Sequence, residues 1–281
     1  MKLLRFGAPG QEKPGILDAN GQIRDISAHI DDIGYQHLND SSLATLRNID
    51  LDACPAVESE VRLGQPVSNV RKVVCIGLNY SDHAEEAGMP IPDEPVVFLK
   101  ADTSLAAPND DVYIPKNSTK LDWEVELGIV IGKTAKYVEE ADAMNHIAGF
   151  CVVNEISERA FQLEGTGQWT KGKSHDGFCP FGPVLTTSDE ISDVQALDVW
   201  LDVDGERVQS GNTRTMIFSV PHMVSYVSQY MTLRPGDLIS TGTPPGVGLG
   251  HKPPRFLSAE QTMQVGIEGL GEITQRVKAM D

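Results

Sequence analysis

The alternation of apolar and polar residues is clearest in residues 121–132, LDWEVELGIVIG. Side chains along a strand alternate between its two faces, so this segment predicts a strand with one apolar face and with Glu124 and Glu126 together on the other. Like charges about 7 Å apart on a strand repel each other, and Glu is a poor strand former. Either solvent or a cation must therefore compensate the two carboxylates, and the segment alone leaves both interpretations open. The apolar face consists of Trp123, Val125, Leu127, Ile129 and Ile131.

Strand-like segments dominate the chain after about residue 70. Two segments in this part are helical instead, VEEADAMNHI and FSVPHMVSYVSQYM, and the second places Val220, Met223, Val224 and Val227 on one face. Strands outnumber helices and do not alternate regularly with them, which argues against Rossmann and TIM-barrel architectures and predicts a mostly β (α+β) fold. The other predicted strands are KVVCIGLN, PVVFLK, AGFCVVNEIS, ALDVWLDVDGERV and DLISTG.

The first 68 residues have the pattern of a smaller unit. The Asn20-Gly21 pair in GILDANGQIRDIS favours a tight hairpin turn between two short strands. A polar segment with weak helical periodicity follows, YQHLNDSSLATLRNID, and LGQPVSNV then has the composition of a linker. We predict a small N-terminal α/β domain over residues 1–68 and a catalytic domain over residues 69–281.

Composition narrows the possible partners. The 281 residues include 40 acidic and 23 basic ones, a net charge of −17 that argues against binding nucleic acid or an anionic membrane. The N-terminus lacks the apolar core of a signal peptide and no run of about 18 apolar residues occurs, so we expect a cytoplasmic protein. The four cysteines have no CxxC spacing and are expected to be reduced structural thiols.

A third acidic residue changes the interpretation of the Glu pair. Glu155 closes the apolar strand CVVNEISER. Three carboxylates nearly neutralise a divalent cation, and an all-oxygen ligand set suits Mg²⁺, Mn²⁺ or Ca²⁺ rather than zinc. The three residues therefore predict a metal site borne on strands.

The segment GLNYSDHAEEAG, which follows a predicted strand, contains a possible acid–base pair. Asp82 with Glu85 three residues later has the spacing of a helix start. In such a helix His83 and Glu86 are neighbours at i,i+3, and a carboxylate beside an imidazole fixes its tautomer and raises its basicity, as a general base requires. The alternative is an ordinary capped surface helix.

Two glycine-rich loops carry further candidates. In WTKGKSHDGFCPFGP, Lys173 is either desolvated and able to stabilise negative charge or a solvated loop lysine. STGTPPGVGLG lacks the spacing of a Walker A or GxGxxG motif, which argues against a nucleotide site. Its backbone amides and the Thr243 hydroxyl are candidates for binding a substrate carboxylate, and a plain turn-rich loop is the alternative.

Taken in order, these motifs resemble the fumarylacetoacetate hydrolase family over about residues 70–281. The resemblance rests on GLNYSDHAEE, PVVFLK, DWEVELGIVIGK, GFCVVNEISERAFQ, WTKGKSHDGFCPFGP, TMIFSVPHMVSYVS and LRPGDLISTGTPPGVG. It implies a β-roll catalytic domain, a homodimer, and Mg²⁺ or Mn²⁺ as cofactor, with Ca²⁺ able to replace them in crystals.

The resemblance also assigns expected roles by motif position. The family often has Asp where this chain has Glu155, and KGFDT where it has KSHDG, so His175 and Gly177 are departures that bear on metal placement and substrate contacts. The implied metal ligands are Glu124, Glu126 and Glu155, the implied catalytic residues are His83, Glu86 and Lys173, and the implied substrate-binding residues are Tyr80, Arg159, Gln162 and Thr243.

The expected function is hydrolysis of a carbon–carbon bond in a 2-oxo acid. The substrate would be an acylpyruvate or a 2,4-diketo-3-deoxy sugar acid, and pyruvate would be released; the chain is most similar to bacterial sugar-acid hydrolases often labelled ureidoglycolate lyase. Ureidoglycolate lyase, oxaloacetate decarboxylase and diene-dioate isomerase are the alternatives, because the family does not settle the reaction. The His-Glu pair favours hydrolysis over decarboxylation, and a non-catalytic metal-binding protein would have no use for it.

Overall fold

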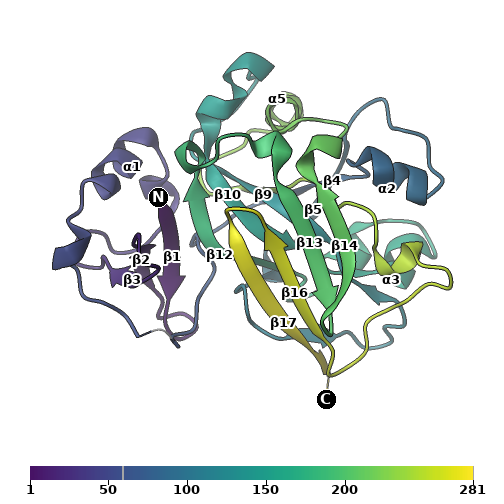
Figure 1. The fold of residues 1–281 in the computed structure, drawn as a ribbon. Helices are drawn as coiled ribbons and strands as arrows, with labels where there is room; N and C mark the ends of the chain where they lie inside the picture. Colours follow the sequence, from purple (N-terminus) through teal and green to yellow (C-terminus); the bar gives the residue numbers. More distant parts are fainter. Residues whose placement is uncertain (59, 281) are drawn as a thin grey trace.

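Three β-sheets form the body of the protein and confirm the mostly β prediction (Figure 1). The computed structural model describes residues 1–58 and 60–280. Within these residues, a ten-stranded sheet has the order β3-β2-β1-β12-β10-β9-β15-β4-β5, with β6 paired to β12. These strands are β1 (Lys2–Phe6), β2 (Lys13–Leu17), β3 (Ile23–Asp25), β4 (Val73–Gly77), β5 (Val96–Lys100), β6 (Leu105–Ala106), β9 (Val125–Ile131), β10 (Ile147–Asn154), β12 (Cys179–Thr187) and β15 (Leu238–Ser240).

A five-stranded sheet, of order β14-β13-β16-β17-β7, packs across β9 and β10 (Figure 1). A two-stranded ladder, β8 (Leu121–Asp122) with β11 (Ser157–Glu158), continues β9 and β10 toward the candidate site. The strands of the five-stranded sheet are β7 (Val112–Ile114), β13 (Asp198–Val203), β14 (Glu206–Asn212), β16 (Thr262–Ile267) and β17 (Gly271–Ala279).

In the described part of the chain, five α-helices and several 3₁₀ turns connect and cover the sheets. The α-helices are α1 (Asp40–Arg47), α2 (Ser81–Glu86), α3 (Arg159–Leu163), α4 (Thr170–Lys173) and α5 (Val220–Tyr230). The 3₁₀ turns are η1 (Tyr35–His37), η2 (Leu51–Ala53), η3 (Asp102–Ser104), η4 (Glu140–His146), η5 (Ser188–Glu190), η6 (Val194–Ala196), η7 (Thr213–Thr215) and η8 (Gly248–Gly250). Among the described residues, no helix is long and apolar enough to cross a membrane.

The predicted apolar face of residues 121–132 lies in one core, and the other face of the strand meets a second core that the sequence did not predict. Val125, Leu127 and Ile129 face the core that β9 shares with the five-stranded sheet. Val130 points the other way and joins a second core with Leu3 of β1. Burial on both faces therefore depends on the N-terminal strands as well as on the catalytic part of the chain.

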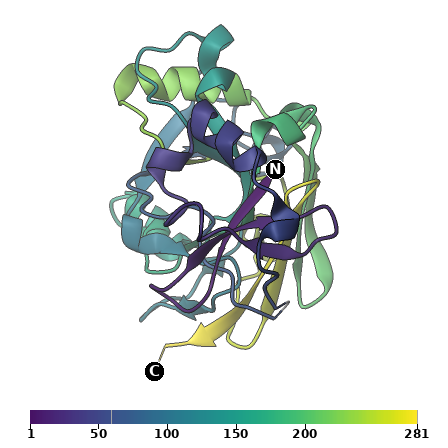
Figure 2. The same cartoon turned by 90° about the vertical axis from the view of Figure 1, so that its left-hand side faces the viewer.

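The N-terminal strands extend the main sheet. β1 pairs antiparallel with β12, with Leu3 opposite Leu185. Figure 2 looks onto this part of the molecule, where α1 and β1–β3 lie below α5 and η4. The predicted Asn20-Gly21 hairpin is present between β2 and β3, and Gly21 has a φ of 79° that suits glycine. The division at residue 68 stays a prediction, because one sheet crosses it.

The two predicted helices of the main body have different outcomes. α5 begins after Ser219, whose side chain accepts a hydrogen bond from His222 N, and its predicted apolar face is buried. VEEADAMNHI forms the 3₁₀ turn η4 rather than an α-helix. Only Ala143 of η4 is buried, so this segment has no apolar stripe to pack as an α-helix would.

The amphipathic packing of α5 gives a first test. Met223 is fully buried, whereas Tyr230 on the same helix is largely exposed. Met223→Ala should lower the free energy of unfolding by about 2–5 kcal/mol, because it removes buried methylenes and leaves a cavity. Tyr230→Ala should change it by less than about 1 kcal/mol. Chemical denaturation of both variants measures the difference, and equal losses would contradict this packing.

Candidate metal centre and active site

Three carboxylates meet where β9 begins and β10 ends. Glu126 lies opposite Val153 in the antiparallel β9–β10 pair, and the Glu155 amide donates a 2.8 Å hydrogen bond to the carbonyl oxygen of Glu124. One oxygen of each side chain lies within 4.8 Å of the others. Their exposed fractions are at most 5%. The interpretation of Glu124 and Glu126 as a solvated strand face is therefore wrong, because both faces of the strand are covered.

Three cationic side chains surround the carboxylates. Lys173 at the end of α4 is buried, with Nζ 2.6 Å from Glu124 Oε2 and 3.3 Å from Glu155 Oε1. Arg159 Nη2 lies 2.6 Å from Glu124 Oε1, and Lys100 Nζ lies 3.7 Å from Glu155 Oε1. Of the two interpretations of Lys173, the structure supports the desolvated one.

With all its carboxylates ionised, the buried cluster carries more negative than positive charge. Arg159 also pairs with Asp122, at 2.7 Å, so four carboxylates face three cationic groups. Glu155 Oε1 is buried and has no hydrogen-bond partner. Burial, together with the charges of Glu155 and Glu124, raises the pKa of Glu126 well above its usual range. An all-oxygen cluster with an orphan acceptor and excess negative charge fits a divalent cation of the Mg²⁺ or Mn²⁺ type.

Glu124 is ionised in this arrangement. Its burial raises the pKa, but the charges of Lys173 and Arg159 outweigh burial and lower the pKa of Glu124 to about 2. For Lys173, burial lowers the pKa, and the nearby charges of Glu124 and Glu155 outweigh it, so the pKa of Lys173 is raised. The site thus contains a carboxylate and an ammonium group in contact, each of which stabilises the charged form of the other.

The glycine-rich loop at residues 240–250 binds the protein's own carboxylates. Gly242 N donates to Glu126 Oε2 at 2.8 Å, and Gly246 N donates to Glu86 Oε1 at 3.0 Å. The sequence suggested that these amides and Thr243 bind substrate. Thr243 instead donates its hydroxyl proton to the Val125 carbonyl oxygen at 2.8 Å, although the residue does line the cavity.

The predicted acid–base pair is present on α2. His83 Nδ1 lies 3.0 Å from Glu86 Oε2, as the i,i+3 spacing implied. Burial raises the pKa of Glu86, but hydrogen bonds from His83 and Gly246 N outweigh it and lower that pKa, so the carboxylate accepts the Nδ1 proton and Nε2 remains as the basic nitrogen. The predicted helix start at Asp82 is wrong. Tyr80 occupies the N-cap position without a side-chain cap, and Asp82 lies inside the helix, where its carboxylate accepts from His83 N and from Thr215 Oγ1.

One cavity of about 560 Å³ joins nearly all the predicted site residues. Tyr80 is the exception, because it is fully buried and its hydroxyl has no hydrogen-bond partner, away from the cavity lining. Arg159 reaches the lining but has its guanidinium committed, with Nη1 donating to Gln162 Oε1 at 3.0 Å. The predicted residues that line the cavity are His83, Glu86, Glu124, Glu126, Glu155, Arg159, Gln162, Lys173 and Thr243.

Sequence reasoning missed two buried charges of the site. Asp122 directly precedes the Trp123-Glu124 pair, and Lys100 closes the strand VVFLK. Both are at most 4% exposed. A charged residue that ends an apolar strand was the available signal, the same one that singled out Glu155, and a buried charge needs a partner of opposite sign.

Comparison with known proteins identifies the family. The model described as "Fumarylacetoacetate (FAA) hydrolase C-terminal" matches residues 72–278. The chain therefore belongs to the fumarylacetoacetate hydrolase family, as its motifs indicated. A protein of Burkholderia ambifaria that carries the name of a hydrolase without a stated substrate is 59% identical over 279 residues, 99% of each chain.

Solved structures agree with this assignment. A fumarylacetoacetate hydrolase from Exiguobacterium antarcticum is 36% identical with a TM-score of 0.87, and both chains are covered completely. A 2-hydroxyhepta-2,4-diene-1,7-dioate isomerase from Mycobacterium marinum is 32% identical with a TM-score of 0.78, over 99% of this chain and 98% of that one. A maleylpyruvate hydrolase from Sphingobium, in complex with manganese(II) and pyruvate, is 26% identical with a TM-score of 0.84 over all of both chains. The fold is thus shared by hydrolases and isomerases.

The carboxylate cluster predicts pH-dependent metal binding. Glu126 holds a proton in the folded protein above its ordinary pKa of 4.5, and a cation must displace that proton. Affinity for Mg²⁺ should therefore rise with pH above 4.5, by at most about tenfold per unit, and metal-free stability should fall over the same window because the folded state binds more protons than the unfolded state.

Titration calorimetry with Mg²⁺ and Mn²⁺ at several pH values measures this. Glu124→Ala and Glu126→Ala should abolish saturable binding while the circular dichroism spectrum stays unchanged. Asp204→Ala, on the exposed β13–β14 turn, is a matched control that should bind like wild type. Absence of saturable binding by the wild-type protein would refute the metal site.

Proposed function

We propose that the protein is a divalent-metal-dependent hydrolase that cleaves the carbon–carbon bond of an acylpyruvate or a 2,4-diketo-3-deoxy sugar acid and releases pyruvate. The observation that carries this proposal is the meeting of the buried carboxylate triad and the His83–Glu86 pair in one cavity. The similar maleylpyruvate hydrolase with manganese and pyruvate supports it.

The carboxylate end of the cavity is suited to a 2-oxo acid. Glu124, Glu126 and Glu155 would hold the cation, which supplies positive charge for the 2-oxo and carboxylate oxygens and for the negative charge that develops on them. With three carboxylates and Asp122 against three protein cations, a divalent ion makes the net local charge positive. A monoanionic substrate then restores neutrality.

The His83–Glu86 pair would activate water. His83 Nε2 accepts a proton from a water molecule that attacks the second carbonyl, at carbon 4, while Glu86 stabilises the resulting imidazolium. The bond between carbons 3 and 4 then breaks, and its electron pair passes to carbon 3 and the 2-oxo group. The imidazolium returns its proton to carbon 3, so that an acylpyruvate and water yield a carboxylic acid and pyruvate.

Lys173 would stabilise the charge on the attacked carbonyl. Its raised pKa keeps the ammonium group charged, and its position between Glu124 and Glu155 fixes that charge at the carboxylate end of the cavity. A fixed charge in a buried site stabilises a developing oxyanion without reorganisation. This role agrees with the one that the family resemblance assigns to the residue.

The alternative reactions share the metal site but use the base differently. Decarboxylation of oxaloacetate needs no water-activating base, whereas isomerisation of a diene-dioate also needs one, and the isomerase from Mycobacterium marinum is among the similar structures. Ureidoglycolate lyase activity remains the other alternative. We also propose that the protein acts on a small 2-oxo acid as a homodimer in the cytoplasm.

Removing the base tests the reaction type. His83→Ala should lower acylpyruvate hydrolysis by about 10²- to 10⁴-fold, the range for loss of a general base, and should leave Mg²⁺ binding intact. Any oxaloacetate decarboxylation should be less affected. His222→Ala is a matched control, because His222 forms a comparable pair with Glu140, 3.1 Å apart, on the surface of α5.

The result could contradict the proposal in two ways. Loss of hydrolysis and decarboxylation to the same extent in His83→Ala would mean that the pair serves a step common to both. Failure of the wild-type enzyme to release pyruvate from every acylpyruvate and diketo sugar acid, with Mg²⁺ bound, would exclude the hydrolase.

A further inference from the structure

The cavity has a second, chemically different half. Away from the carboxylates, its lining is contributed by the α2–β5 connection, β5, the α3–α4 region and the loop around η8. Nearly all of these side chains are apolar. They are Leu78, Met89, Val96, Phe98, Leu163, Trp169, Val247, Leu249 and Pro254.

Several of the exposed apolar side chains of this protein lie together in that half. Among the described residues, twelve large hydrophobic side chains are at least 37% exposed, and four of them line this cavity. Exposed apolar side chains that gather at one concave site mark a surface that a ligand covers. The four are Met89, Val96, Leu163 and Leu249.

Trp169 forms a fixed wall of this half. Its indole lies over Gly77, where an added Cβ would be 2.5 Å from Trp169 Cζ3. The Phe98 ring meets it edge-on at 5.3 Å between centroids. The absence of a side chain at Gly77, at the end of β4, leaves the space that the indole occupies. The indole is therefore packed between Gly77 and Phe98.

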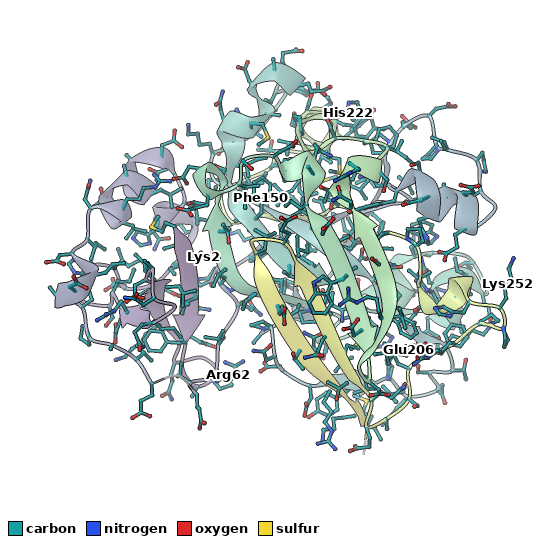
Figure 3. The ribbon with its side chains drawn as sticks, viewed as in Figure 1. Lys2, Arg62, Phe150, Glu206, His222 and Lys252 are labelled. Atoms are coloured by element: carbon teal, nitrogen blue, oxygen red, sulfur yellow. The ribbon has the colours of Figure 1, made fainter. Side chains whose placement is uncertain are left out.

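Polar groups are scarce in the same half. His251 is one, and its Nε2 is buried without a hydrogen-bond partner. Lys252 is another, but its side chain extends outward from the molecule (Figure 3). Gln162 of α3 also lines the cavity, and its Oε1 already accepts a hydrogen bond from Arg159. The Thr243 hydroxyl proton is already donated to Val125. A polyhydroxylated chain would leave several hydroxyl groups buried without partners, which is unfavourable.

We propose that the acyl group of the substrate is an apolar alkyl or aryl group that binds against this wall, rather than a polyhydroxylated or carboxylated chain. This inference rests on the proposed hydrolysis of acylpyruvates and selects among its substrates. The 2-oxo acid end lies at the carboxylates, and the acyl group lies against Trp169 and Leu163.

Pyruvate release by the Mg²⁺-loaded enzyme tests the inference with four probes: acetylpyruvate, hexanoylpyruvate, maleylpyruvate and a 2,4-diketo-3-deoxy sugar acid. The value of kcat/KM for hexanoylpyruvate should exceed that for each other probe at least tenfold. A preference for maleylpyruvate or the sugar acid overturns the inference and leaves the hydrolase intact. No pyruvate from any probe refutes the hydrolase itself.

A variant separates the wall from the chemistry. Leu163→Asp places a charge among the apolar side chains and should lower kcat/KM for hexanoylpyruvate about tenfold more than for acetylpyruvate. Met144→Asp is the matched control, because Met144 is also an exposed apolar residue but does not line the cavity. Equal effects of Leu163→Asp on the two substrates would contradict the assignment of the wall.

Asp122 is fully buried and lies between the carboxylate cluster and the loop that contacts the His83–Glu86 pair. One of its oxygens accepts from Gly248 N at 2.6 Å, and the other accepts from Leu249 N at 3.0 Å and from Arg159 Nε at 2.7 Å. Arg159 in turn holds Glu124.

The loop that Asp122 holds also positions the base. Gly246 N binds Glu86, and an added Cβ at Gly250 would lie 2.9 Å from the Glu86 carboxyl carbon. We infer that Asp122 is a positioning residue that fixes the metal ligand Glu124 through Arg159 and the base pair through this loop.

Asp122→Asn tests this second inference, which shares the metal site and base of the proposed function. The variant keeps an oxygen for Gly248 N but loses the charged acceptor that Leu249 N and Arg159 Nε share, so Mg²⁺ affinity and kcat should each fall about tenfold or more while KM changes less than threefold. Asp32→Asn, which removes a comparable carboxylate from Arg5, is the control and should change neither. A lower melting temperature of Asp122→Asn with unchanged Mg²⁺ affinity and kcat would reduce Asp122 to a structural role.

Discussion

The burial of like charges at the β9–β10 end is the constraint on which the rest of the site depends. Taking a carboxylate out of water costs several kcal/mol unless opposite charge or hydrogen bonds replace the lost hydration. Here that replacement comes from three separate segments, since Lys100 ends β5, Arg159 begins α3 and Lys173 ends α4. Each cation stands at the terminus of an element, where a backbone change can aim one long side chain inward. The positions of the sheet and of the two short helices α3 and α4 therefore determine together how the buried charges are compensated.

The glycine-rich loop follows from the same constraint. Gly242 and Gly246 have φ values of 95° and 101°, and both amides point at carboxylates. A Cβ at Gly246 would lie 1.9 Å from the Val208 carbonyl oxygen, so the loop cannot approach β14 with any other residue. Its composition suggested anion binding, which is correct in kind. The anions, however, are side chains of the protein itself.

Local pattern was enough to predict β4, β5, β9, β10, β13 and β15, the Asn20-Gly21 turn and the spacing of His83 and Glu86, because each depends on a few consecutive residues. It did not predict β12, β16 or β17. Features that depend on contacts between residues far apart in the chain could not be predicted from local sequence patterns. The Asp82 carboxylate accepts from Thr215, which is 133 residues away in the chain. The contribution of β1–β3 to the main sheet depends on pairing with β12, which no local pattern contains. Family resemblance supplied the roles of Arg159 and Lys173, whereas their ion pairs required the fold.

The anchoring of α2 supports a reaction in which His83 acts as a base. The helix is tied down on two sides, by the Ser81 hydroxyl and Asp82 carboxylate to Thr215 and by Glu86 to Gly246 N. This anchoring holds His83 at the edge of the cavity with Nδ1 committed to Glu86, so that Nε2 is the nitrogen left for a water molecule. Decarboxylation would need none of these contacts. Glu86, the Gly246 amide and Thr215 together orient one imidazole, an arrangement suited to proton transfer, which hydrolysis and isomerisation need and decarboxylation does not.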